Sequence, residues 1–280
     1  IRYAPEKVSY CDNTVLLFRM EEFLEAAKTG KIESLKELID GKADINALDR
    51  EDYTALMWAT IRRRNDCVQR LVNSKANVDI QNSDKYSPLM WAVLDGNMDC
   101  ARSLLNAKAS IDLRDKLGRT ALSWAVLSGH AECAQLLLDS NADIDAVNRD
   151  GWTALTWAAA RGHVHCIHLL LNTKAALEIS DPLGKTALVW ATMRGQTNCV
   201  KMLINAKANM QVKSENDRTL LMWATMNGHT ACMQLLVDMN ADLEAQDGDG
   251  KTALMLAASG GPVASLLTLL KGRIAGEKSS

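Results

Sequence analysis

The chain has 280 residues, of which 48% are hydrophobic and 24% charged, with 32 basic and 34 acidic side chains. These proportions are typical of a globular protein, and the balanced charge argues against wholesale binding to nucleic acid or to an anionic membrane. No run of 18 apolar residues occurs, so we expect neither a membrane-spanning helix nor a signal peptide.

Residues 1–19 open the chain and do not share the periodic pattern that follows them. They contain Cys11, the one cysteine outside that pattern, and a short apolar run at 15–18. Two interpretations stay open for this segment. It either caps the exposed face of the first repeat or lies extended in a binding groove of its own chain.

From residue 20 to residue 272 the sequence repeats itself every 33 residues. Six units follow one another without insertion, between a shorter first unit and a shorter last one. The eight units begin near 20, 49, 82, 115, 148, 181, 214 and 247. Such a period is typical of stacked repeats, which bury their apolar faces only against one another. We therefore predict one repeat domain over 20–272 and a flexible tail over 273–280.

Each unit follows the same local plan. A turn with the pattern D-x-x-G-x-T comes first, and its glycine suits a positive φ. A hydroxyl then caps a short first helix with a narrow apolar stripe, and a glycine separates this helix from a leucine-rich second helix. The capping hydroxyls are those of Thr54, Ser87, Thr120, Thr153, Thr186, Thr219 and Thr252.

The full pattern, T-A-L-x-W-A…G-H-x-x-C-x-x-L-L-L…A-D-I-D-A, resembles the ankyrin repeat over about residues 20–272. The resemblance implies an all-α solenoid of helix-turn-helix units with β-hairpin-like loops and a concave binding face. The chain departs from the family where a glycine usually precedes the constant alanine. Lys or Asn stands there instead, and a left-handed backbone costs Lys about 1 kcal/mol relative to Gly. These residues are Lys42, Lys75, Lys108, Asn141, Lys174, Lys207 and Asn240.

Six cysteines recur at one register of the second helices: Cys67, Cys100, Cys133, Cys166, Cys199 and Cys232. Stacked helices lie about 8–10 Å apart, whereas a disulfide needs Cα atoms within about 7 Å. We therefore predict reduced core thiols in a cytoplasmic or nuclear protein. A metal site at His163, His165, Cys166 and His168 is disfavoured because the cysteine is expected to face away from the histidines. We expect no metal or other cofactor.

Six tryptophans recur at one register of the first helices: Trp58, Trp91, Trp124, Trp157, Trp190 and Trp223. Residues three and four positions later share their helix face; those expected to contact a partner are Leu94, Leu127, Met193, Met226, Arg161 and Arg194. The resemblance implies that this face lines the concave groove. Two interpretations stay open and are compatible: the indoles pack between adjacent helices, or they present an edge to a partner.

The residues that directly precede the capping hydroxyls are expected at the loop tips, as the other wall of the groove. They are Tyr53, Tyr86, Arg119, Trp152, Lys185, Arg218 and Lys251. The first two are aromatic and later ones are mostly basic. Together with Arg161 and Arg194 they predict a mildly positive groove that suits a partner with an acidic segment.

The leading functional hypothesis is a non-enzymatic scaffold or adaptor that binds a peptide or protein partner in the Trp-lined groove. We expect a monomeric domain of a larger protein. No nucleophile elbow, phosphate loop or HExxH motif occurs, so no catalytic residue is predicted.

The alternative is a reader of methylated lysine. The stretch from Trp152 to Trp157 resembles a W-T-P-x-x-W-A stretch in the ankyrin domain of euchromatic histone lysine methyltransferases. The resemblance implies a cage of Trp152, Trp157 and Trp190 that holds the cation. Ala160 replaces the acidic cage residue and Arg161 follows it, which opposes this function.

Overall fold

The structure is a computed structural model that describes residues 10–260 and 262–277. Within these residues the chain forms sixteen helices, and β-type pairing is limited to two isolated bridges, Ser180 with Thr186 and Ser214 with Arg218. Each repeat supplies two helices joined by a short turn. The predicted all-α repeat fold is therefore confirmed.

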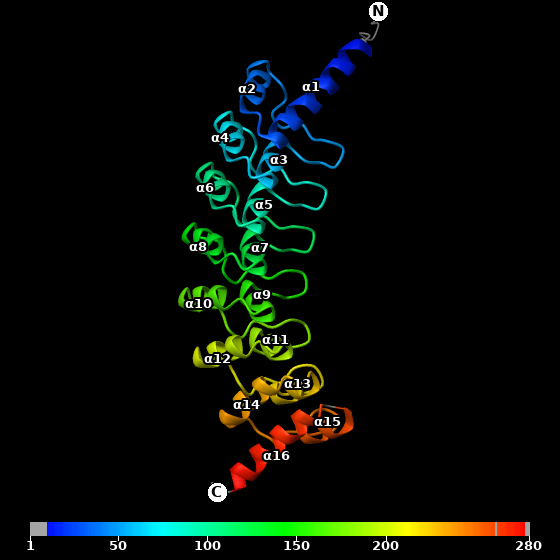
Figure 1. The fold of residues 1–280 in the computed structure, drawn as a ribbon, viewed down its shortest axis with the longest axis vertical. Helices are drawn as coiled ribbons and strands as arrows, with labels where there is room; N and C mark the ends of the chain where they lie inside the picture. The colour runs from blue at the N-terminus through cyan, green and yellow to red at the C-terminus, as the bar shows by residue number, and fades with distance from the viewer. Residues whose placement is uncertain (1–9, 261, 278–280) are drawn as a thin grey trace, which may run out of the picture. The chain divides into compact units, whose positions relative to one another are not determined.

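The helices form two compact units, Ile1–Lys116 with Asp139–Ala142, and Leu117–Leu138 with Asp143–Ser280. The first helices of the repeats are α1 (Tyr10–Thr29), α3 (Ala55–Ile61), α5 (Pro88–Leu94), α7 (Ala121–Leu127), α9 (Ala154–Arg161), α11 (Ala187–Met193), α13 (Leu220–Met226) and α15 (Ala253–Gly260). The second helices are α2 (Ile32–Asp40), α4 (Asn65–Asn73), α6 (Met98–Asn106), α8 (Ala131–Asp139), α10 (Val164–Asn172), α12 (Thr197–Asn205), α14 (Thr230–Asp238) and α16 (Val263–Glu277). Within each unit the first helices lie in one row and the second helices in another (Figure 1).

The hydroxyl caps form as the sequence predicts, with one exception. Thr54 Oγ1 accepts a hydrogen bond from the backbone N–H of Met57 at 3.1 Å, and the same bond recurs at every other predicted cap except Thr186. Each bond satisfies one donor that the first turn of a helix leaves without a partner. The caps fix where the first helices begin.

Lysine and asparagine adopt the left-handed backbone that the family pattern assigns to glycine. The seven residues before the constant alanine have φ between 59° and 72°, as in Lys108 at 65° and Lys207 at 72°. The conformation ends each second helix and turns the chain toward the next loop. The repeat therefore keeps its geometry at a conformational cost of about 1 kcal/mol for each lysine.

The six periodic cysteines lie buried as free thiols, which confirms the predicted core role. Desolvation raises the pKa of Cys166 and Cys199 to about 11 and that of Cys100 to about 12. Because the thiolate is the nucleophile, we expect iodoacetamide at neutral pH to leave all six unlabelled in the folded protein and to label them in urea. Peptide mass spectrometry measures this, and labelling of any of the six without denaturant would contradict the buried placement.

For the segment at the amino terminus the sequence left open a cap and an extended path, and the structure bears on the second. Residues 10–19 belong to α1, which is helical without interruption from Tyr10 to Thr29 and contacts α2 and α3. An extended path through the groove is therefore wrong for residues 10–19. Residues 1–9 and the side chain of Cys11 lie outside what the structure describes.

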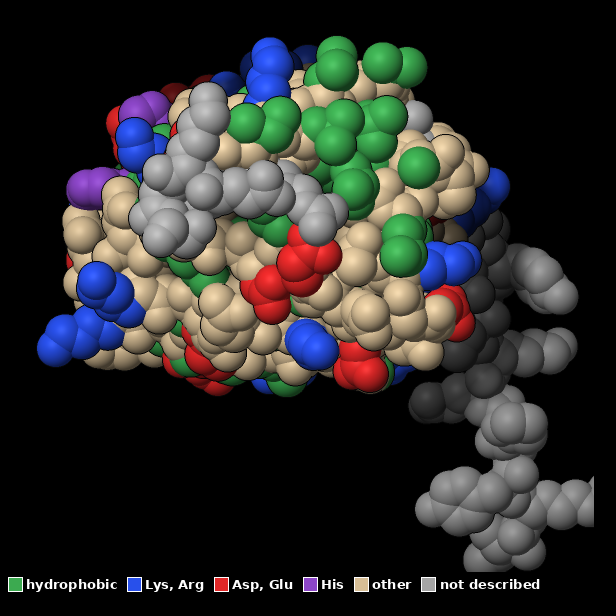
Figure 2. Space-filling model, turned by 90° about the horizontal axis from the view of Figure 1, so that it is seen from below, with side chains coloured by type: hydrophobic (Ala, Val, Ile, Leu, Met, Phe, Trp, Pro, Cys, Tyr) green, Lys and Arg blue, Asp and Glu red, His purple; other side chains and the backbone are tan. Residues whose placement is uncertain are grey.

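Helix α16 continues to Glu277, so the tail that we predicted from residue 273 is helical over residues 273–277. Its exposed apolar side chains, Val263, Leu267, Leu270 and Ile274, follow helical spacing along one face. Figure 2 shows hydrophobic side chains gathered on one part of the face seen from below. Such a face is where a further repeat would stack in an array of this kind. Over residues 10–260 and 262–277, no helix has the length and apolar content needed to cross a bilayer.

Candidate functional site

The residue before each of the first six capping hydroxyls lies against the tryptophan five positions later. In the first unit the ring centroids of Tyr53 and Trp58 are 4.9 Å apart, and those of Tyr86 and Trp91 are 4.8 Å apart. In the second unit the guanidinium carbon of Arg119 lies 4.0 Å from the ring centroid of Trp124. The loop closes at this residue, because Asp49 N donates to the Tyr53 carbonyl oxygen at 3.0 Å. The prediction that these residues form loop tips is therefore wrong.

The same residues also reach the tryptophan of the following repeat. Tyr53 lies 6.0 Å from Trp91 between ring centroids, Trp152 lies 4.5 Å from Trp190, and Lys185 Nζ lies 5.2 Å from the centroid of Trp223. In these three pairs of successive tryptophans, tryptophan and intervening side chain thus alternate. We call this arrangement the indole ladder. It favours packing as the main role of the tryptophans.

Burial agrees with that role. Trp124 and Trp223 are only 9% and 6% exposed, whereas the other tryptophans on the ladder are half-buried. Four periodic tryptophans (Trp58, Trp91, Trp157 and Trp190) keep part of their surface in solvent, and two are core residues.

The indole N–H groups differ in their acceptors. Trp58 donates to Asp49 Oδ2 at 2.6 Å, Trp190 to Asp181 Oδ2 at 3.1 Å, and Trp223 to Ser214 Oγ at 2.9 Å. In each case the acceptor stands nine residues earlier in the chain. Asparagine (Asn82 and Asn148) stands nine residues before Trp91 and Trp157. The indole nitrogens of these two tryptophans are buried without an acceptor.

The asparagine side chain explains that difference. Asn148 Oδ1 accepts from the backbone N–H groups of Asp150 and Trp152, at 3.0 and 2.8 Å. These bonds fix the side-chain oxygen toward the loop and leave the NH₂ group, a donor, where Asp181 has its second oxygen. An indole N–H cannot bond to that donor, and an unsatisfied buried donor costs about 1–3 kcal/mol.

The ionisation of Asp49 reflects the same contacts. Partial burial raises the pKa of this carboxyl, but hydrogen bonds from the N–H of Tyr53, the indole of Trp58 and the N–H of Glu51 lower it, with a further contribution from the charge of Lys28. The net pKa lies below the ordinary value of 3.8. The folded state is therefore stabilised by the ionised Asp49 above that value, and this stabilisation is lost as the pH falls through the folded pKa.

Two cations that the sequence predicted in the groove wall, Lys185 and Arg218, lie against tryptophans of the ladder. Lys185 is 6% exposed, lies between Trp190 and Trp223, and forms an ion pair with Glu215 at 2.7 Å between Nζ and Oε2. Hydrogen bonding to Lys185 and its charge lower the pKa of Glu215. Arg218 lies 5.2 Å from the centroid of Trp223. The expected positive wall is thus reduced, because these side chains cover indoles.

The residues three and four positions after each periodic tryptophan keep part of their surface in solvent. Leu94, Leu127 and Met193 are half-buried, and Met226 is 42% exposed. Arg161 and Arg194 are exposed. In the second unit these positions form one strip across α9, α11 and α13, which pack in succession. We call Ala160, Arg161, Met193, Arg194, Met226 and Asn227 the contact strip.

The three tryptophans of the reader hypothesis do come together. Trp152 lies 4.3 Å from Trp157 and 4.5 Å from Trp190 between ring centroids, at 51° in both pairs. Rings at this separation are in van der Waals contact, so no gap remains between them for a methylated ammonium group. Arg194 also lies 5.9 Å from the centroid of Trp190.

The side chains of the possible metal site in the fifth repeat do not point to a common position. His163 Nε2 lies 3.1 Å from the carbonyl oxygen of Leu127, His168 pairs with Asn172 on its own helix, and Cys166 is buried. Among the described residues, no three His, Cys, Asp or Glu side chains are placed to share a metal ion.

Two sets of contacts were not predicted from the sequence: the side chains that lie against the tryptophans and the acceptors of the indole N–H groups. The five-residue spacing from the ladder side chains to the tryptophans and the nine-residue spacing from Asp, Asn or Ser are both constant in the sequence. These spacings are the signal that would have identified the pairs.

A family model described as ankyrin repeats (3 copies) matches residues 23–115, 62–148, 141–214 and 204–277. No curated protein matches the chain.

Proposed function

The chain belongs to the ankyrin-repeat family, and from that premise we propose that it is a non-enzymatic module that binds a peptide or protein partner along the contact strip. Repeats of this family generally mediate protein–protein interaction. The observation that carries the proposal is the exposure of Arg161, Arg194 and Met226 at the ends of three successive first helices. Apolar side chains flanked by arginine are typical of the residues that anchor a protein interface.

The chemistry of the strip favours a partner that presents carboxylates next to apolar side chains. The guanidinium groups of Arg161 and Arg194 are exposed, and an arginine can bind a carboxylate through two parallel hydrogen bonds. Lys185 does not add to this charge, because its ammonium group is buried and paired with Glu215. An acidic segment of the partner would therefore contact α9 and α11.

Charge reversal on the strip tests the function. We expect the double variant Arg161→Glu/Arg194→Glu to fold as the wild type does and to lose the proteins that the wild-type chain captures from cells. The physical reason is that like charges across an interface cost several kcal/mol, whereas exposed substitutions change the free energy of unfolding by about 0.5 kcal/mol or less. Quantitative mass spectrometry of the captured proteins measures the loss.

The matched control is Lys201→Glu/Lys213→Glu, which makes the same change in net charge. Both lysines are exposed, and Lys201 lies on α12, in the other row of helices. The control is expected to capture the wild-type set. If the strip variant and the control recover the same proteins, the strip is not the binding surface.

The methyl-lysine reader is the second candidate, and the convergence of Trp152, Trp157 and Trp190 is what favours it. Binding would require Trp152 to leave its contacts with both neighbours, which is why we place this function second. Titration of histone-tail peptides carrying mono- and dimethyl-lysine is expected to leave the tryptophan fluorescence unchanged. A saturable change that the unmethylated peptides do not produce would establish the reader instead.

A further inference from the structure

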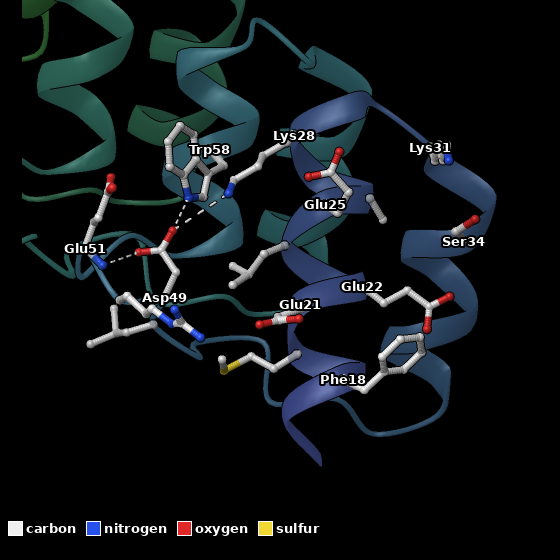
Figure 3. Close-up of a pocket in the computed structure, with 15 residues that line it drawn as sticks. Phe18, Glu21, Glu22, Glu25, Lys28, Lys31, Ser34, Asp49, Glu51 and Trp58 are labelled. Carbon is white, nitrogen blue, oxygen red and sulfur yellow. Dashed lines mark hydrogen bonds and ion pairs between the residues drawn. The ribbon is translucent and has the colours of Figure 1, made fainter. Parts of the chain in front are cut away.

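A cavity of about 1000 Å³ lies beside Trp58, near the amino-terminal end of the first compact unit. Its walls are residues of α1, the beginning of α2 and the loop that carries Asp49 (Figure 3). The loop adds the exposed Leu48 and Glu51. The contact strip contributes no residue to this cavity, so the cavity is a separate place on the molecule.

The alternation of the indole ladder explains why this cavity exists. The face of Trp91 that looks toward the preceding repeat is covered by Tyr53, that of Trp190 by Trp152, and that of Trp223 by Lys185. Each covering residue stands 38 positions before its tryptophan. The residue 38 positions before Trp58 is Met20, which lies inside α1 and not at a turn. The first repeat therefore has no loop side chain to complete the ladder.

Lys28 occupies part of this position. Its Nζ lies 4.2 Å from the ring centroid of Trp58 and 3.9 Å from Asp49 Oδ2 (Figure 3). The second distance is at the outer limit of an ion pair, and the Lys28 side chain keeps 29% of its surface in solvent. Pairs of this kind contribute little to stability, so Lys28 is a weakly held occupant. Its presence shows that the space over Trp58 accepts a cation.

The charges around the cavity favour a second cation. Five carboxylates line it against three basic side chains: Glu21, Glu22, Glu25, Asp49 and Glu51, and Lys28, Lys31 and Arg50. Figure 3 shows Glu21 and Lys28 on the side of α1 that faces Asp49. A cavity with walls of one prevailing sign concentrates ligands of the opposite sign.

We propose that this cavity binds an arginine side chain of a basic partner peptide, which displaces Lys28 from the ladder position over Trp58. A planar guanidinium group stacks on an indole and bonds carboxylates in a fixed geometry, which the compact ammonium of Lys28 cannot do. The stacking of a guanidinium on an indole recurs in the chain itself, where Arg119 lies 4.0 Å from the centroid of Trp124.

Fluorescence anisotropy with the full chain tests the proposal. The probe is a labelled seven-residue glycine peptide with two arginines, and its control carries citrulline, the uncharged isostere, at both positions. We expect the arginine peptide to bind at least about tenfold more tightly, because citrulline keeps the plane and loses the charge. Equal binding of the two peptides would overturn the proposal.

Variants then locate the site. Glu21→Gln/Glu25→Gln is expected to weaken binding about three- to tenfold, while Glu33→Gln/Glu37→Gln, on exposed positions of α2 outside the cavity, leaves it unchanged. Lys28→Met is expected to tighten binding more than Lys31→Met, although both remove one positive charge from the cavity, because only Lys28 lies over Trp58. Equal effects within either pair would overturn the assignment. Arg161→Glu/Arg194→Glu is expected to bind the peptide as the wild type does, so failure here and failure of the proposed function are separate results.

Discussion

Replacing Trp152 by alanine is expected to lower the free energy of unfolding by about 2–3 kcal/mol, less than the ~3–5 kcal/mol for a core aromatic side chain because this ring is half-buried. The ring lies 4.3 Å from Trp157 and 4.5 Å from Trp190, so the change removes contacts with two repeats at once. A residue at a loop tip would cost about 0.5 kcal/mol or less. Urea denaturation followed by far-ultraviolet circular dichroism distinguishes these two values.

The control for this change comes from the chain itself. Tyrosine holds the same register in the second and third repeats, where Tyr53 and Tyr86 lie 4.9 and 4.8 Å from their tryptophans. Trp152→Tyr is therefore expected to cost only about 1 kcal/mol, since it keeps a ring in the ladder. A wild-type stability for the alanine variant would mean that Trp152 does not bridge the two repeats.

Replacing Asp181 by asparagine is expected to lower the free energy of unfolding by about 1–3 kcal/mol, the cost of a buried donor left without a partner. The substitution is isosteric. Its remaining oxygen can still accept from the backbone N–H groups of Leu183 and Lys185, as Asp181 Oδ1 does at 2.9 Å. What is lost is the acceptor for the indole N–H of Trp190.

The reciprocal change is expected to have the opposite sign. Asn82→Asp places an acceptor beside Trp91 Nε1, which is buried without a partner, and should raise the free energy of unfolding by about 0.5–1.5 kcal/mol. The indole proton resonance of Trp91 in an NMR spectrum should move downfield as the bond forms. If both substitutions leave the midpoint of urea denaturation where it is, the indole bonds carry no net stability.

Much of the repeat was determined by the sequence alone, because it depends on contacts within a few residues. The hydroxyl of Thr54 bonds the N–H three positions later, and the left-handed backbone of Lys108 follows from its place between a helix and the next loop. The burial of Cys166 follows from the period of its helix. Local rules that recur at a fixed period predicted the helices, their caps and the apolar faces.

Only the tertiary structure decided which surface is free to bind. The sequence placed Lys185 at a loop tip, but its ammonium group is buried between two indoles and paired with Glu215. The sequence also gave no period to residues 10–19, which extend α1 and leave Trp58 beside a cavity. A spacing of 33 residues makes two side chains neighbours, but it does not fix which atoms meet. That depends on how closely adjacent repeats stack and on the direction of each side chain, and both are set by packing between the repeats.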